Sequence, residues 1–263
     1  MKAEEIDTYL KNLLGRPIRD LPQIKSNLAR MPRSLASFYD AHDGTVDRIV
    51  FGRRDREVRG IAVCWMAYCT AIRRAAELGA NVVVTHEPTF FNRLDLDEIS
   101  EITPEVRNKI DLLEELKVTI IRCHDVWDLR YPEPGILSEW AAYIGLNHSI
   151  VADGYYAIYA TAPQPALSFA KKVAAKTRCL GQSVVGFYGD PERTVKRIGI
   201  GTGAASDPFR LFQLGADLAV VADDAPNNTA WIAGAWCHDT GNPAVVVNHA
   251  VAEAPGIAAL ASH

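Results

Sequence analysis

Runs of apolar residues alternate with amphipathic stretches along most of the chain after residue 60. The clearest run is ANVVVTHEPTFF, residues 80–91, in which three successive valines predict a buried strand. Pro88 should end that strand, because proline has no backbone N–H to donate. Other apolar or alternating runs predict further strands at residues 60–65, 118–123, 155–162, 183–188, 197–201 and 217–223.

Amphipathic segments between these strands predict helices at residues 1–14, 67–78, 104–116, 138–145 and 166–177. Gly15 and Gly79 stand where such helices end. Pro163 and Pro165 are expected to end one strand and to lead into the next helix. Strands and helices that alternate at this spacing predict right-handed crossovers and a largely parallel sheet.

Two regions carry no clear pattern. Residues 16–55 contain several prolines and lead into a charged run, and we expect them to be poorly defined. Within them His42 and Asp43 are expected to be solvated turn formers, or less simply a loop pair. Residues 124–135, HDVWDLRYPEPG, are predicted to form a loop.

The chain repeats itself in two places. Leu-Gly-Ala occurs at residues 78–80 and again 136 positions later, each time directly before an apolar strand. His124 and Asp128 are followed 125 positions later by His249 and Glu253, so both histidines have an acid four residues on. An internal duplication explains both repeats, although helix capping can produce Leu-Gly-Ala twice independently.

These patterns predict an α/β fold of two similar lobes, with mainly parallel or mixed sheets flanked by helices. The boundaries are expected at residues 1–145 and 146–263, with residues 1–59 poorly matched to the repeat. The carboxyl ends of the strands from both lobes should meet at one cleft, so the lobes can also be counted as a single domain sharing one site.

Composition excludes several classes of protein. A chain of 263 residues with a net charge of −4 and a pI near 6.0 has no overall field that would attract nucleic acid or an anionic membrane. No secretory signal or apolar run of membrane-spanning length is present. The five cysteines are scattered and form no C-x-x-C pair, which favours reduced thiols and a cytoplasmic protein.

Polar side chains follow four of the apolar strands, as the pairs His86 with Glu87, His124 with Asp128, Asp223 with Asp224, and His249 with Glu253. Mixed imidazole and carboxylate groups suit borderline-to-hard divalent metals. If the chain after His249 is helical, His249 and Glu253 lie on one helix face and can bind one ion, or Glu253 can bridge two. The alternative is that these groups cap helices and pair with one another on a solvated wall.

A glycine-rich turn follows the strand at residues 197–201. Gly201, Gly203 and Ser206 precede a helix, so their backbone N–H groups could bind an anion such as phosphate. The spacing does not match the dinucleotide fingerprint G-x-G-x-x-G. Close chain packing and a helix cap at Ser206 or Asp207 explain the turn equally well.

Four segments in order give the chain a family resemblance: LGANVVVTHEPTFF, RCHDVWDL, GTGAAS with LGADLAVVADD, and NHAVAEAPGIAAL. They resemble the H-H-P strand end, the H-T-N-x-D loop, the Gly-rich turn with its T-G-E strand, and the G-H-x-x-x-E element of the Nif-three-like family of dinuclear-metal proteins. This family is named after the NGG-one-interacting factor and is also labelled type-two homologues of GTP cyclohydrolase one.

The resemblance implies a metal-ligand set of His86, Glu87, Asp128, His249 and Glu253. Glu253 would bridge two ions, with Glu87 and Asp128 on the first and His86 and His249 on the second. It further implies that His124 and Asp224 contact the ligands and not the ions, and that His124 orients Asp128 or a bound water. Glu253 and His124 are the catalytic candidates.

The chain departs from the family pattern at three points. Glu87 stands where the family has its second histidine, Asp224 replaces the glutamate of T-G-E, and the D-N-x-G-L motif is not recognisable in HDGTVDRIVFG. A carboxylate at Glu87 adds negative charge and favours oxygen-loving metals, or marks a site that holds one ion or none.

The resemblance therefore implies one or two divalent ions (Zn, Fe, Mn, Ni or Mg) and metal-dependent hydrolysis of a small cyclic amide, ester or phosphoester. The alternative is a regulatory or metal-trafficking protein without turnover. A homo-oligomer, commonly a ring of six, is also implied. Residues 127–140, an aromatic and proline-rich stretch, are the expected contact surface.

Overall fold

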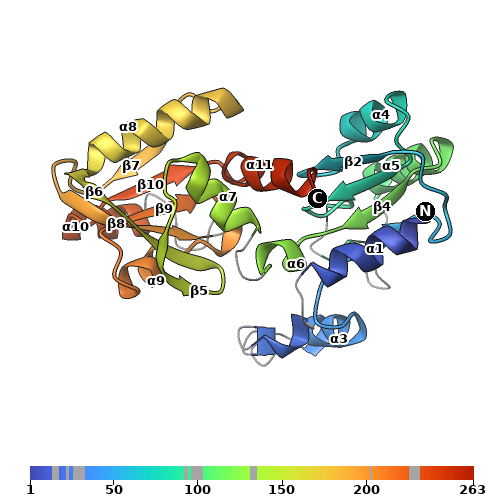
Figure 1. Cartoon of the computed structure of the whole chain (residues 1–263), viewed down its shortest axis with the longest axis horizontal. Helices are drawn as coiled ribbons and strands as arrows, with labels where there is room; N and C mark the ends of the chain where they lie inside the picture. Colours follow the sequence, from blue (N-terminus) through green and yellow to red (C-terminus); the bar gives the residue numbers. More distant parts are fainter. Residues whose placement is uncertain are drawn as a thin grey trace. The chain divides into compact units, whose positions relative to one another are not determined.

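The computed structural model describes residues 1–13, 18–21, 24–25, 33–91, 94–95, 103–130, 135–201, 203–224 and 232–263. The chain divides into two units, each with its own sheet (Figure 1). Unit 1 comprises Met1–Pro132 and Leu260–His263, and unit 2 comprises Glu133–Ala259.

In the described part of unit 1, four strands form a sheet in the order β1-β4-β3-β2. They are β1 (Arg48–Phe51), β2 (Ile61–Cys64), β3 (Val82–Thr85) and β4 (Thr119–Arg122). Strands β2, β3 and β4 are parallel, and β1 is antiparallel to β4. The carboxyl ends of β3 and β4 therefore lie side by side, and the residues after them, His86 and Cys123 onward, are neighbours.

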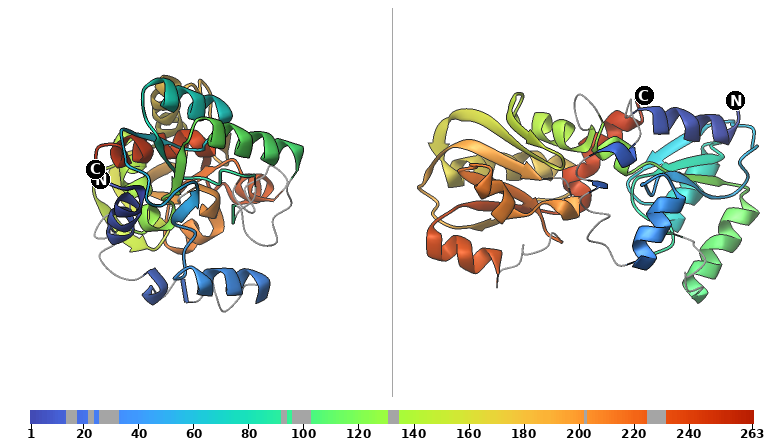
Figure 2. Two further views of the ribbon diagram at one scale, coloured as in Figure 1. Left: turned by 90° about the vertical axis from the view of Figure 1, so that its right-hand side faces the viewer. Right: turned by 90° about the horizontal axis from the view of Figure 1, so that it is seen from below.

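Helices cover both faces of the unit 1 sheet (Figures 1 and 2). Helices α4 (Cys69–Glu77) and α5 (Pro104–Glu115) pack on one face, where Ile72 and Leu113 are fully buried against the strands. Helix α1 (Ala3–Asn12) lies on the other side and buries an apolar stripe that includes Ile6 and Leu10. Unit 1 also contains α3 (Arg33–Ala41), α6 (Asp125–Asp128) and the 3₁₀ turn η1 (Ile18–Asp20).

An open apolar pocket of about 760 Å³ lies within unit 1, between α1, strands β2 and β3, and the last residues of the chain. Its walls are mostly aliphatic, and the polar groups on them belong to Glu5, Tyr9 and His263. Ile61, on the edge strand β2, is 45% exposed here, so α1 leaves part of this sheet face uncovered.

In the described part of unit 2, six strands form a sheet in the order β5-β6-β8-β9-β10-β7. Strands β8, β9 and β10 are parallel, and their neighbours β6 and β7 are antiparallel to them. The strands are β5 (Ser149–Asp153), β6 (Tyr156–Pro165), β7 (Gly186–Tyr188), β8 (Thr194–Gly201), β9 (Leu218–Ala222) and β10 (Ala244–Val247).

Two sets of helices sandwich the unit 2 sheet. Helices α7 (Gly135–Tyr143), α8 (Ala166–Thr177) and α11 (His249–Leu260) contribute to the core on one face. Helices α9 (Pro208–Gln213) and α10 (Ala233–Thr240) pack on the other, where Phe209 and Phe212 contact Trp236. The short 3₁₀ turns are η2 (Arg178–Leu180) and η3 (Gly203–Ala205).

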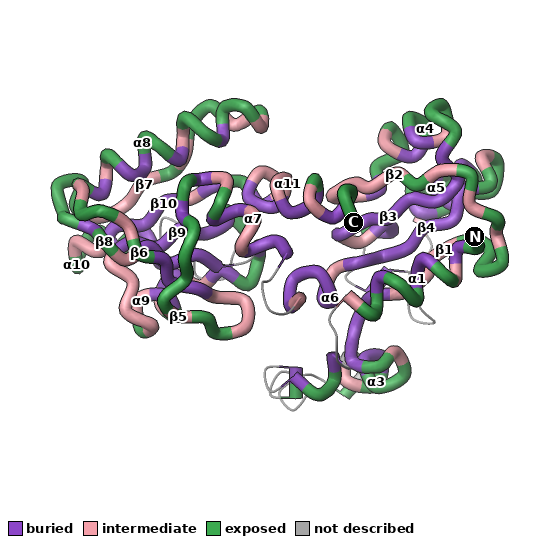
Figure 3. The backbone as a smooth tube through the Cα atoms, viewed as in Figure 1, coloured by how far each residue is buried: buried purple, intermediate pink, exposed green. Residues whose placement is uncertain are grey.

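Both units follow one topology. In each, a parallel trio of strands (β2-β3-β4 and β8-β9-β10) has an antiparallel strand beside its last member and is followed by a helix that carries the recurring histidine and acid. The central strands β3 and β9 are buried along their whole length (Figure 3), as their apolar runs predict. The predicted α/β fold of two similar lobes with mixed sheets is confirmed.

The structure corrects several local predictions. Residues 16–55 include the regular elements α3 and β1, because β1 pairs with β4 far along the chain. The predicted loop after His124 begins with the short helix α6. Strand β6 continues through both prolines to Pro165, since its pairing with β8 shifts register between Ala160 and Gln164 and so accommodates them.

The prediction of an exposed contact surface at residues 127–140 is wrong for its two tryptophans. Trp127 is 0% exposed and contacts His263 edge-on, and Trp140 is 2% exposed within the unit 2 core. Part of that stretch, and the predicted helix end at Gly15, lie outside the described residues. No helix in the described ranges is long and apolar enough to cross a membrane.

Candidate metal site

His86 and Glu87 follow β3 directly and are held by backbone bonds to the end of β2. The His86 and Glu87 N–H groups both donate to the Trp65 carbonyl, at 3.2 and 2.7 Å. The His86 ring is fully buried, and its Nδ1 lies 3.0 Å from the carbonyl oxygen of Cys123. Because a carbonyl can only accept, Nδ1 carries a proton, and in the neutral ring the lone pair is on Nε2. Nε2 lies 3.7 Å from Asp128 Oδ1.

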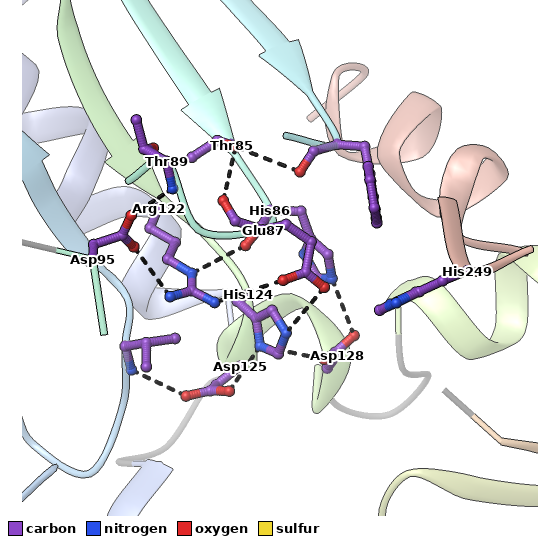
Figure 4. A network of polar contacts seen from close by, with 12 residues as sticks. Thr85, His86, Glu87, Thr89, Asp95, Arg122, His124, Asp125, Asp128 and His249 are labelled. Atoms are coloured by element: carbon purple, nitrogen blue, oxygen red, sulfur yellow. Dashed lines mark hydrogen bonds and ion pairs between the residues drawn. The ribbon is translucent and has the colours of Figure 1, made fainter. Parts of the chain in front are cut away.

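His124 stands at the start of α6 and stacks on His86, with ring centroids 4.5 Å apart (Figure 4). Its Nδ1 lies 2.9 Å from Asp125 Oδ1 and 3.5 Å from Asp128 Oδ2. Its Nε2 lies 3.9 Å from Glu87 Oε1. The short helix therefore places an imidazole between carboxylates of α6 and the carboxylate that follows β3.

The electrostatics of this cluster follow from burial and close opposite charges. Burial alone lowers the pKa of His124, but Asp128, Asp125 and Glu87 outweigh it and raise that pKa to about 10. Burial alone raises the pKa of Asp125, but the hydrogen bond and charge of His124 lower it to about 2. The raised pKa favours the protonated ring, so a cation that binds at the ring of His124 would compete with that proton.

A residue that the sequence reasoning missed, Asp47, anchors α6 from the β1 side. Its carboxylate accepts from the backbone N–H groups of His124 and Val126, the latter at 2.8 Å, and so caps the helix. Thr45 Oγ1 lies 2.8 Å from Asp47 Oδ2 and 3.0 Å from Asp125 Oδ2. Burial and the charge of Asp125 raise the pKa of Asp47. Because the contact spans 77 residues of sequence, no local motif could have revealed it.

A second missed group is the buried guanidinium of Arg122, at the end of β4. Arg122 Nε donates to the His86 carbonyl at 3.2 Å, and its terminal nitrogens lie 3.1 Å from Asp95 Oδ2 and 3.8 Å from Glu87 Oε2 (Figure 4). Asp95 Oδ1 in turn accepts from the Phe90 N–H at 3.2 Å. One side chain thus contacts both members of the His86–Glu87 pair.

Unit 2 carries its own histidine–carboxylate cluster at the end of β10. His249 begins α11, so Glu253 follows one turn later on the same face, and His249 Nε2 lies 2.9 Å from Glu253 Oε1. On the other side of the ring, Nδ1 lies 2.9 Å from Asp224 Oδ2. Asp223 accepts from the His249 N–H at 3.2 Å. A carboxylate behind the imidazole is the usual arrangement for a metal-binding histidine.

The glycine-rich turn lies against this second cluster. A Cβ on Gly203 would stand 2.3 Å from His249 Nε2 and 2.4 Å from Glu253 Oε1, so only glycine fits. The Ser206 hydroxyl donates to the Gly203 carbonyl at 2.6 Å and accepts from the Ala222 N–H at 2.8 Å, which fixes the turn to β9. Asp207 caps α9 by accepting from the Phe209 N–H.

Both clusters have the chemistry of metal donors. In unit 1, ligand atoms of His86, Glu87 and His124 lie within 4.8 Å of one another, and Asp128 is beside both rings. Imidazoles backed by a carbonyl or a carboxylate, with carboxylates nearby, fit a divalent cation. The described residues of unit 2 bring together His249, Glu253 and Asp224. That the two sets meet in one cleft stays a prediction.

The fold and the clusters together define an α/β protein with possible metal-binding residue groups. Residues 26–263 match the Duf34/NIF3 (NGG1p interacting factor 3) family, and the chain belongs to that family. The resemblance predicted from the four motifs is confirmed, and the match also takes in most of the N-terminal region that the motifs left out.

Several solved structures share this fold. The Staphylococcus aureus protein SA1388 has a TM-score of 0.73 and 16% identity, covering 100% of this chain and 91% of that one. The protein ybgI, of unknown function, has a TM-score of 0.73 and 21% identity, covering 100% and 92%. Reduced HcgD from Methanocaldococcus jannaschii has a TM-score of 0.69 and 14% identity, covering 99% and 92%. No curated protein matches the chain.

Proposed function

We propose that this protein is a divalent-metal-dependent hydrolase of a small cyclic amide, ester or phosphoester. One observation carries the proposal: His86, Glu87 and His124 bring ligand atoms within 4.8 Å of one another, and the tautomer of His86 aims the Nε2 lone pair toward Asp128. Family membership and the second cluster, on α11, support it.

The proposed ligands are His86, Glu87, His124 and Asp128 in unit 1 and His249 and Glu253 in unit 2. The position of His124 favours a ligand role over the orienting role that the resemblance implied, because Nδ1 is backed by Asp125 while Nε2 is on the side of Glu87. Asp224 orients His249 through Nδ1.

A divalent ion at such a site supplies a water whose pKa is lowered to about 7 and neutralises charge on a substrate oxygen. The protein's own groups do the rest. Glu253 is 1% exposed and lies against His249, where its carboxylate can accept a proton from an attacking water. Asp47 and Arg122 hold the loops that carry His124 and His86.

Elemental analysis of the purified protein and a substrate panel test the proposal. Esters, phosphodiesters and cyclic amides should be assayed with metal-free protein and with added Zn²⁺ or Mn²⁺, and with Glu253→Gln as the control. We expect metal-dependent turnover of one substrate class that Glu253→Gln abolishes. Bound metal without turnover would favour a regulatory or metal-trafficking role.

We further propose that the chain assembles into a closed homo-oligomer, as its family resemblance implies, with a ring of six as the expected form. Light scattering at micromolar concentration tests this. A mass of one chain, 28.9 kDa, would refute it.

A further inference from the structure

In the unit 1 cluster, Glu87 is an expected cation ligand, yet it lies beside Arg122, which is itself a cation. Arg122 is paired across the sheet with Thr85, two residues before Glu87. The guanidinium is 3% exposed, and one of its terminal nitrogens lies 3.8 Å from Glu87 Oε2. A guanidinium keeps its charge in any protein environment.

Two carboxylates lie beside Arg122 among the residues that the structure describes. Asp95, which is fully buried, holds the nearer contact at 3.1 Å, and Glu87, whose side chain is 13% exposed, holds the farther one. Asp95 is fixed in place by N–H groups of Thr89 and Phe90, so it is committed to the guanidinium. Glu87 is therefore the carboxylate that can bind a second cation.

We propose that Arg122 is the built-in counter-ion of Glu87 and weakens the binding of a divalent cation there. The inference rests on the metal site proposed above and adds the residue that sets its affinity. A positive charge this close to a ligand carboxylate lowers the attraction between that carboxylate and an ion, since Coulomb energy in a poorly solvated cluster falls only slowly with distance. The position that depends on Glu87 should bind more weakly than the position at His249 and Glu253.

The test removes the charge of Arg122 and neutralises Asp95 as well, so that no buried carboxylate is left opposite an apolar residue. Two matched double variants of the full-length protein do this: Asp95→Asn with Arg122→Met, and Asp95→Asn with Arg122→Lys. Methionine and lysine are both long and unbranched, and both lack the Nε–H that donates to the His86 carbonyl. Lysine keeps a positive charge and methionine has none. Thermal unfolding confirms that both variants are folded.

Each metal-free variant is titrated with Mn²⁺, and free Mn²⁺ is followed by electron paramagnetic resonance. The Arg122→Met variant is expected to bind Mn²⁺ at least about tenfold more tightly than the Arg122→Lys variant. Adding Glu87→Gln to both should shrink that ratio by at least about threefold, because the carboxylate that Arg122 compensates is gone.

Equal affinities in the two double variants, or a ratio that Glu87→Gln leaves unchanged, would overturn the inference while leaving the metal site intact. No Mn²⁺ or Zn²⁺ binding by any variant, wild type included, would overturn the proposed site and the inference with it. If the double variants do not fold, the single variants decide. Glu87→Gln should then weaken Mn²⁺ binding less than about threefold and Asp128→Asn at least about tenfold, and equal losses would refute the inference.

Discussion

The turn from β4 into α6 and the turn from β10 into α11 place the same pair of residue types but hold them in different ways. Each places a histidine at the end of a parallel strand and an acid four residues later, His124 with Asp128 and His249 with Glu253. In unit 1 the helix is a single turn, and distant side chains hold it, chiefly Asp47. In unit 2 the helix has twelve residues and is held by its own length and by close backbone packing.

The two clusters differ in what surrounds their histidines. In unit 1, His124 lies among three carboxylates and Glu87 lies beside an arginine. In unit 2, His249 lies between two carboxylates, each at 2.9 Å, and Gly203 leaves no room for a side chain against His249 and Glu253. Substitutions that add volume should therefore act most strongly in unit 2, whereas substitutions that change charge should act in both units.

The largest effect is expected from Glu253→Ala. Loss of the proposed bridging carboxylate should remove both ions, because each would lose a charged ligand. Elemental analysis of the purified variant measures this. Cys123→Ala is the control, since its thiol is buried at a strand end but is not a proposed ligand, and its metal content should match wild type. Equal metal retention in the two variants would rule out the ligand set.

Gly203→Ala should come next, with a loss of metal affinity of about 10- to 100-fold. The added methyl would displace His249 and Glu253 from their present positions. Gly181→Ala is a matched control, because Gly181 also has a positive φ, +91°, but nothing within 4 Å of an added Cβ. Zinc titration of both variants separates crowding from backbone strain. A similar loss in the control would mean that strain alone is responsible.

Glu87→His is expected to change metal preference more than total binding. An imidazole is the better donor for zinc, so zinc retention after mild chelation should rise relative to manganese. Competition between the two metals for metal-free protein gives the shift directly. An unchanged preference would show that Glu87 is not a ligand.

The smallest effects are expected when one of two helix caps, Asp47 or Asp207, is removed. Asp47→Ala should lower the free energy of unfolding by about 1–3 kcal/mol, because it leaves the buried N–H groups of α6 without their acceptor. Asp207→Ala, at the start of α9, should cost about 1 kcal/mol. Metal affinity should fall in the first variant only, since Asp47 positions His124. Denaturant unfolding measures the stability of each variant, and metal titration measures its affinity. Equal losses of stability and of affinity in the two variants would contradict the prediction.

The apolar runs were enough to predict the strands that form the centre of both sheets. Strands β3 and β9 are buried on both faces and so consist almost wholly of Val, Ala and Leu. Gly79 and Gly215 follow their helices in the left-handed conformation that the repeated Leu-Gly-Ala predicts. These features depend on residues that are close in the sequence, so the local pattern is enough to predict them.

The supporting contacts were not predictable in the same way. Asp47 lies 77 residues from the N–H group of His124 that it caps, and Asp95 lies 27 residues from Arg122. Periodicity indicates which residues are buried, but it does not indicate which buried charges meet. The proline-containing end of β6 was missed for a related reason, because its pairing with β8 and not its own composition keeps it extended.

Titration of the metal-free, full-length protein with Mn²⁺ or Zn²⁺ tests the central claim most directly. We predict two equivalents of unequal affinity in wild type, the weaker of which disappears in Asp128→Ala. One equivalent in both proteins would contradict the two-ion site, and the absence of saturable binding in wild type would contradict the account of both clusters as metal ligands.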